Sequence, residues 1–144
     1  MILFLDFDGV MHPLNQTNLF CREGSLARVL RDFPEVEVVI SSSWRETHTL
    51  KNMLTFFLTD LRSRIVGVTP VIELRDTADV SGVRLREINQ YLAVTDNQHR
   101  RWVALDDAAV LLSPDCAELV LCDGNLGFGE SEEQILRDRL QPKP

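Results

Sequence analysis

Residues 2–10 read Ile-Leu-Phe-Leu-Asp-Phe-Asp-Gly-Val, an apolar run that leads directly into two aspartates and a glycine. A run of β-forming residues without polar alternation is typical of a strand that is buried on both faces of a parallel sheet. Similar short runs recur along the chain and predict four further strands. The five predicted strands span 2–7, 36–41, 64–68, 102–105 and 118–122.

Between these strands, apolar residues recur at the i, i+3, i+4, i+7 spacing of amphipathic helices. The predicted helices span 26–33, 50–61, 85–92 and 135–140. The pattern over 50–61 covers three turns behind Ser43 and Glu46, whose spacing is typical of a capping box, and Ser131 and Gln134 have the same spacing ahead of the last helix. The alternation of strands and helices predicts a three-layer α/β/α sandwich around a five-stranded parallel sheet.

Composition limits the class of protein. The chain has 144 residues, of which 44% are hydrophobic and 26% charged, so we expect residues 1–144 to form a single globular domain. Its net charge of −7 opposes non-specific attraction to nucleic acid or anionic lipid, so any nucleic-acid contact would have to be local. It lacks a membrane-spanning run and a secretory signal, and its three cysteines lack metal-ligand or redox spacing. We therefore expect a cytoplasmic protein with free thiols.

Polar residues end three of the predicted strands. These strand ends are Asp6-Phe7-Asp8-Gly9, Ser41-Ser42-Ser43 and Asp106-Asp107. Alone, Asp6-Phe7-Asp8-Gly9 could be a turn, and Asp106-Asp107 could be acidic residues that stabilise a helix N-terminus. Because the carboxyl ends of parallel strands meet at one edge of the sheet, however, the four carboxylates would repel one another unless a cation or proton lay among them. Oxygen-only ligands suit Mg²⁺, and the Ser41 hydroxyl beside a helix N-terminus would offer an anion site.

This ordered set of motifs resembles the haloacid dehalogenase (HAD) superfamily of phosphohydrolases. Residues 2–10 resemble the first motif, 38–41 the second, a basic residue near Arg84 the third, and 103–107 the fourth. The resemblance covers nearly the whole chain and implies a Rossmann-like HAD core. More narrowly, residues 41–45, 84–88 and 102–107 resemble stand-alone domains akin to the phosphatase half of polynucleotide kinase-phosphatases and RNA-repair enzymes.

The resemblance implies a Mg²⁺-dependent phosphomonoester hydrolase that acts through an aspartyl-phosphate. Asp6 would be the nucleophile, and Asp8 would protonate the leaving oxygen and then activate water. Mg²⁺ would be bound by Asp6, Asp106, Asp107 and the main-chain carbonyl of Asp8. Ser41 would donate to the phosphoryl group.

The third-motif cation falls on a predicted helix that carries two arginines. At about 100° per residue, Arg84 lies roughly 70° from the centre of the apolar face and Arg86 about 130°. We therefore expect Arg84 to lie nearer the sheet and to contact the phosphoryl group.

Other residues near the motifs have two interpretations each. Ser43 is expected to cap the following helix, and Ser42 either to cap it or to bind substrate. In the first interpretation, Trp44 is an apolar anchor at the helix terminus and Arg45 a solvated charge. In the second, Trp44 contacts a substrate base and Arg45 a substrate phosphate. The three histidines lack the spacing of metal ligands, and we expect them at the surface or in loops. They are His12, His48 and His99.

Members of the superfamily that have cap domains insert them after the first motif or after the third strand. Here the corresponding intervals, 10–24 and 69–80, are too short to fold independently, so we expect a capless enzyme. A large substrate such as a nucleic-acid 3′-end would then close the site itself. The side chains expected to meet it are Trp44, Arg45, His99, Arg100 and Arg101.

Two other functions remain open from the sequence. The first is a small-metabolite phosphatase that borrows a dimer partner as its lid, and the second is a binding module that has lost turnover. The four aspartates argue against the second. A receiver-type signalling domain would need a phosphoacceptor after the third strand, and residues 66–69 offer none.

Overall fold

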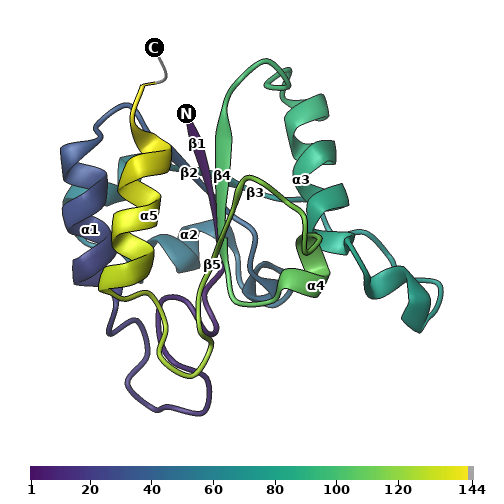
Figure 1. The fold of residues 1–144 in the computed structure, drawn as a ribbon, viewed down its shortest axis with the longest axis horizontal. Coiled ribbons are helices and arrows are strands. Elements are labelled where there is room, and N and C mark those ends of the chain that lie inside the picture. The colour runs from purple at the N-terminus through teal and green to yellow at the C-terminus, as the bar shows by residue number, and fades with distance from the viewer. Residues whose placement is uncertain (143–144) are drawn as a thin grey trace.

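Five short strands form one parallel sheet in the computed structural model, which describes residues 1–142 (Figure 1). The strands are β1 (Ile2–Leu5), β2 (Glu37–Ile40), β3 (Ile65–Val68), β4 (Trp102–Asp106) and β5 (Leu119–Leu121). Their order is β3-β2-β1-β4-β5, and every neighbouring pair is parallel. The predicted parallel α/β/α fold is confirmed. β1 lies in the middle of the sheet, which explains its apolar run.

Helices cover both faces of the sheet. The α-helices are α1 (Glu23–Asp32), α2 (Leu50–Leu54), α3 (Val83–Val94), α4 (Ala109–Leu112) and α5 (Glu130–Leu140), and the 3₁₀ helices are η1 (Ser43–Glu46), η2 (Thr59–Arg64) and η3 (Thr77–Val80). Figure 1 shows α1 and α5 on one side of the sheet and α3 and α4 on the other. Leu3 and Leu5 of β1 are buried in the core on the α1 side, whereas Ile2 and Phe4 are buried on the α3 side. The sheet is thus the middle layer of three.

The predicted three-turn helix over 50–61 is wrong, because α2 ends after five residues. In a continuing helix the Leu58 N–H would donate to the backbone carbonyl four residues earlier. It donates instead to Glu23 Oε1 in α1 at 2.9 Å. Met53, Phe57 and Leu61 are nevertheless buried. The apolar spacing therefore predicted the burial of these three residues, but not the exposure of Leu58, which is 41%, or the backbone conformation.

Both predicted capping boxes are displaced. Ser42, not Ser43, is the N-cap of η1, and its Oγ accepts the Trp44 N–H at 3.4 Å. At α5, the Glu132 carboxylate accepts the N–H of Gly129 at 3.0 Å, so the helix begins before Ser131. Ser43 and Glu46 thus lie in a separate 3₁₀ helix, and α2 has Thr49 as its N-cap, whereas α5 begins two residues earlier than the side-chain spacing indicated.

Two segments extend beyond the carboxyl ends of the strands (Figure 1). Residues 10–22 join β1 to α1, and residues 69–82 join β3 to α3 and include η3. Within residues 1–142 neither forms a separate cap domain, as expected. None of the helices described is both long and apolar enough to cross a membrane.

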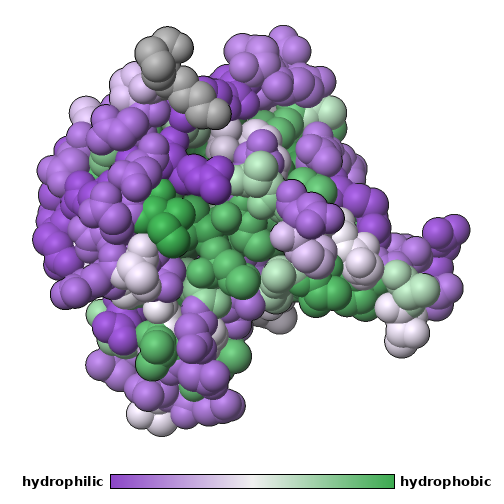
Figure 2. All heavy atoms as spheres, viewed as in Figure 1, coloured by the Kyte–Doolittle hydropathy of each residue, from purple (hydrophilic) through white to green (hydrophobic). Residues whose placement is uncertain are grey.

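The edge strand β5 leaves apolar surface uncovered. Figure 2 shows hydrophobic side chains gathered in the middle of the viewed face, where Figure 1 draws β5. Leu121 of this strand is 49% exposed. The polar chemistry lies elsewhere, at the carboxyl ends of the central strands.

Candidate active site

Three aspartates meet where β1 and β4 end. Leu5 pairs with Leu105, so Asp6 and Asp106 follow in neighbouring positions, and the Asp6 N–H donates to the Leu105 carbonyl at 3.0 Å. Carboxylate oxygens of Asp6, Asp106 and Asp107 lie within 4.8 Å of one another. The strand ends therefore bring these acids together as the sequence predicted.

The surroundings of these carboxyl groups disfavour their ionised forms. Burial, with the charge of Asp106 added, raises the pKa of Asp6 to about 7, although Arg84 opposes the shift. Burial raises the pKa of Asp106 to about 6, and that of Asp107 is raised for the same reason. A cation among the three groups would relieve both the lost hydration and the mutual repulsion.

The donor set fits a hard divalent cation. Asp106 Oδ1 accepts the Ala108 N–H at 2.9 Å, but its buried Oδ2 has no hydrogen-bond partner. Asp107 fits closely against two glycines, because a Cβ at Gly9 or Gly124 would overlap its Oδ2. Oxygen-only ligands with one unpartnered buried carboxylate oxygen suit Mg²⁺.

Asp8 does not join this group of carboxylates through its side chain. Its Oδ1 lies 2.9 Å from His12 Nε2, and its Oδ2 accepts the Trp44 indole N–H at 2.9 Å. His12 lies in the loop that follows β1, as one of the two expectations had it, but it is 2% exposed and therefore not a surface residue. The only sequence signal for this contact was the spacing of four residues between Asp8 and His12 across the Gly9 turn, where φ is +73°.

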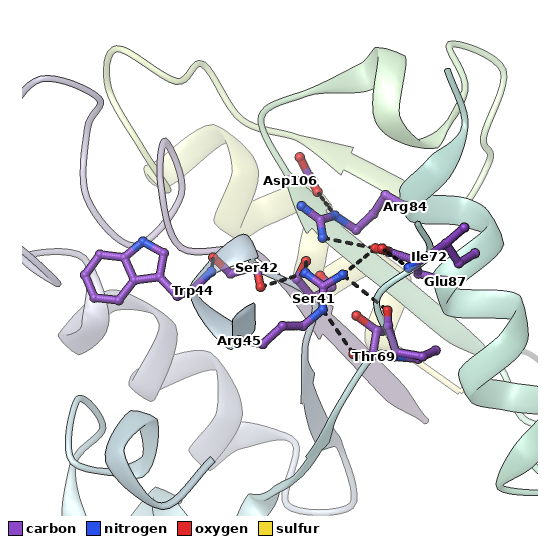
Figure 3. A network of polar contacts seen from close by, with 10 residues as sticks. Ser41, Ser42, Trp44, Arg45, Thr69, Ile72, Arg84, Glu87 and Asp106 are labelled. Carbon is purple, nitrogen blue, oxygen red and sulfur yellow. Dashed lines mark hydrogen bonds and ion pairs between the residues drawn. The ribbon is translucent and has the colours of Figure 1, made fainter. Parts of the chain in front are cut away.

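Arg84 lies at the centre of a buried network of charges (Figure 3). Its Nη1 donates to Glu87 Oε2 at 3.3 Å, and its Nε lies 3.5 Å from Asp106 Oδ2 without a hydrogen-bond partner. Arg86, by contrast, donates to the carbonyls of Ser81 and Asp79 in an exposed position. The predicted orientation of the two arginines is correct, and the Nε–H of Arg84 contacts the acid cluster as an ion pair without forming a hydrogen bond.

Arg45 is a buried structural cation, and its interpretation as a solvated charge is wrong. The side chain is 2% exposed, and its Nη2 lies 2.6 Å from Glu87 Oε2. Its remaining N–H groups donate to the carbonyls of Ser41, Ser42, Thr69 and Pro70 (Figure 3). Burial lowers its pKa, while Glu87 raises it. Arg45 thus ties the ends of β2 and β3 to α3.

The two serines that follow β2 are both buried beside the acid cluster. The Ser41 N–H donates to the Leu5 carbonyl at 2.9 Å, which holds the end of β2 against β1. A hydrogen bond from the Ser42 side chain lowers the pKa of Asp6. Ser42 therefore contacts Asp6 directly, and Ser41 lies at the end of β2, next to the strand that carries Asp6.

Trp44 belongs to an aromatic cluster rather than to an open surface. His48 stacks on it with ring centroids 5.1 Å apart, and the rings of Phe20 and Phe56 meet it edge to face at 5.5 Å. Its indole N–H is already bonded to Asp8. Trp44 thus contacts Asp8 directly, and the rings of Trp44 and His48, both half-buried, line one hollow beside Asp8.

Three residues expected to meet a large substrate lie at the opposite edge of the sheet. His99, Arg100 and Arg101 directly precede β4, whereas Asp106 ends it. Arg100 pairs with Glu37 at the start of β2. The expectation is wrong because residues before and after a strand lie at its opposite ends.

One protein-family model matches residues 2–133, nearly the whole chain. Its description is the HAD domain in Swiss Army Knife RNA repair proteins. Neither the curated proteins nor the solved structures contain a match.

Proposed function

Since the chain belongs to the HAD domains of Swiss Army Knife RNA repair proteins, we propose that it is a Mg²⁺-dependent phosphomonoesterase that acts through an aspartyl-phosphate on Asp6. The observation that carries this proposal is the buried group of Asp6, Asp106 and Asp107, which faces the Nε–H of Arg84. Negative ligands for a cation and a positive donor for a phosphate would then share one reaction centre.

The residues divide the chemistry in two steps. Asp6 attacks phosphorus and the bond to the leaving oxygen breaks, while the proton of Asp8 passes to that oxygen and gives the free alcohol. Asp8 then takes a proton from water, whose oxygen attacks the same phosphorus and releases inorganic phosphate and the Asp6 carboxylate. The arrangement leaves Asp6 and Asp8 in their starting forms.

Mg²⁺ would be held by Asp6, Asp106, Asp107 and the main-chain carbonyl of Asp8. When bound, it supplies positive charge that offsets the acids and the phosphate dianion. Binding of the cation requires the ionised forms of Asp6 and Asp106, which burial alone disfavours. The acid cluster is thus adapted to a bound cation rather than to an empty site.

The phosphoryl group would be bound by Ser41, Ser42 and Arg84. Both serines follow β2 and are buried beside Asp6. Arg84 would use its Nε–H, and its guanidinium plane is held by Glu87. A planar, permanently charged group suits a tetrahedral anion that must be bound in one orientation.

The substrate we propose is a nucleic-acid end that carries a terminal phosphate. Family membership among RNA repair domains supports this substrate class, and the absence of a cap within residues 1–142 leaves room for a large molecule. Arg45 and Trp44 contribute indirectly. Arg45 holds Glu87 by an ion pair, and Trp44 holds Asp8 by a hydrogen bond.

The covalent step can be tested by acid quenching with ³²P-labelled substrate. We expect the wild-type protein with Mg²⁺ to retain label that hydroxylamine removes, as an acyl phosphate would. Asp6→Asn should retain no label and lose turnover, while Asp115→Asn, at an exposed acid outside the cluster, should behave as wild type. Turnover by Asp6→Asn at the wild-type rate would refute the covalent mechanism.

A further inference from the structure

Two hydrogen-bond donors hold the Asp8 carboxyl group from opposite sides. His12 Nε2 lies 2.9 Å from Oδ1, and the Trp44 indole N–H donates to Oδ2 at 2.9 Å. The Asp8 side chain is 46% exposed, whereas that of His12 is 3% exposed. A half-exposed aspartate would otherwise sample several rotamers, so buried His12 and half-buried Trp44 restrict it to one.

The direction of the hydrogen bond from His12 follows from its other ring nitrogen. The Phe20 backbone N–H, which can only donate, lies 3.3 Å from His12 Nδ1. Nδ1 is therefore the acceptor, and in the neutral ring the proton is on Nε2, which donates to Asp8. Each Asp8 oxygen accepts one bond and keeps a second lone pair for the reacting proton.

The backbone around His12 is shaped to keep this donor in place. Phe20 has a φ of +58°, uncommon for a bulky residue, and its ring stacks on Phe56 at 4.6 Å. Gly127 has a φ of +71°, and a Cβ there would lie 3.0 Å from the Val10 carbonyl and 3.4 Å from the backbone carbon of His12. A strained turn on one side and a close backbone approach on the other thus hold His12.

We propose that His12 and Trp44 are positioning residues that fix the Asp8 carboxyl group for proton transfer to the leaving oxygen and from water. This inference rests on the proposed function. No proton leaves His12 or Trp44 in either step, because each only donates a hydrogen bond while the proton moves between Asp8 and the substrate oxygen or water. Their contribution is to keep the carboxyl group within reach of the reacting oxygen.

The experiment compares His12→Leu with His12→Gln. Leu fills the space without a donor, whereas the Gln side-chain amide can present an N–H near the position of Nε2. The measured quantity is the rate of leaving-group release in a single turnover, with an alkyl phosphate and with p-nitrophenyl phosphate. A good leaving group needs little help from an acid, so positioning should matter only for the alkyl ester.

We expect His12→Leu to slow alkyl release about 10- to 100-fold, part of the effect of a general acid, and p-nitrophenol release less than about threefold. His12→Gln should recover most of the alkyl rate, and Trp44→Phe should show the same selectivity as His12→Leu. The matched control is His99→Leu at the exposed, opposite edge, which should leave both rates unchanged.

Equal losses on both substrates, or no recovery with Gln in a variant whose thermal melt is normal, would overturn the proposal. If His12→Leu fails to fold, Trp44→Phe and His12→Gln decide the same question. Acid quenching separates this failure from that of the proposed function. A ³²P-labelled enzyme formed equally by wild type and His12→Leu from both esters would refute the positioning role alone, whereas an unlabelled wild type would refute the covalent mechanism.

Discussion

Asp6 and Asp106 are more than nine-tenths buried, yet the proposed chemistry requires them to carry charge. Burial raises the pKa of Asp6 to about 7 and that of Asp106 to about 6, from an ordinary value of 3.8. Between the ordinary pKa and the raised pKa of each group, the folded protein binds more protons than the unfolded chain. Their contribution to stability is therefore present at low pH and is lost as the pH rises from about 4 to about 7.

We predict that removing the Asp6 charge stabilises the metal-free protein by an amount that grows as the pH rises through this window and is largest above it. With a chelator present, the melting temperature of Asp6→Asn should exceed that of wild type by about 5 °C at pH 8 and by much less at pH 5. Mg²⁺ at pH 8 should raise the melting temperature of wild type more than that of the variant. Asp115→Asn is the control, and a difference that does not vary with pH would contradict the assigned pKa shift.

At the scale of a single element, one turn of α3 decides which arginine serves the site. Arg84 and Arg86 are about 200° apart on the helix, so only one of them can face the sheet. Arg84 reaches Asp106 and Glu87, while Arg86 contacts only carbonyls of the preceding segment. Glu87, one turn further on, links the same helix to Arg45 and to the N–H of Ile72.

We predict a large difference between the two alanine variants. Arg84→Ala should lower kcat by about 10²- to 10³-fold, the usual cost of removing a donor to a developing anion, and Arg84→Lys should recover part of it. Arg86→Ala should stay within about threefold, since its contacts are exposed. Circular dichroism and thermal melts check that both variants fold. A greater loss with Arg86→Ala would assign the phosphate contact to that residue.

For the whole molecule, the absence of a cap within residues 1–142 is the decisive property. The acid cluster lies at the end of the sheet, between the segments 10–22 and 69–82, and a hollow lined by Asp8, Trp44 and His48 opens beside it. A lid normally excludes water and grips the remote part of a small substrate. On the proposed function, a large substrate would supply that contact itself.

We predict that a 3′-phosphorylated oligonucleotide is a better substrate than the matching mononucleotide. Stacking of one base, for which the half-buried ring of His48 is placed, adds about 1 to 3 kcal/mol, so kcat/KM should rise by about tenfold and the advantage should shrink as salt rises. His48→Ala should reduce the advantage, and Arg101→Ala, at the opposite edge, should not. Equal values for the two substrates would favour a small-metabolite phosphatase.

The sequence by itself determined the layers of the fold and the meeting of Asp6 with Asp106. Apolar runs predict buried parallel strands, and in any such sheet the residues that end adjacent strands lie together, so no knowledge of side-chain contacts was needed. The orientation of Arg84 also followed from helical geometry alone. These features depend on periodicity and chain direction, which are local properties.

Only the tertiary structure decided the partners of the remaining polar groups. His12 and Arg45 looked like surface residues, but the first is held between Asp8 and the Phe20 N–H, and the second is bonded to Glu87, 42 positions further along the chain. The helix predicted over 50–61 ends at Leu54, and beyond it the Leu58 N–H donates to Glu23 in α1. Apolar spacing shows that a residue is buried, but the partner of a buried polar group is chosen by whichever donor or acceptor the fold brings within hydrogen-bond distance.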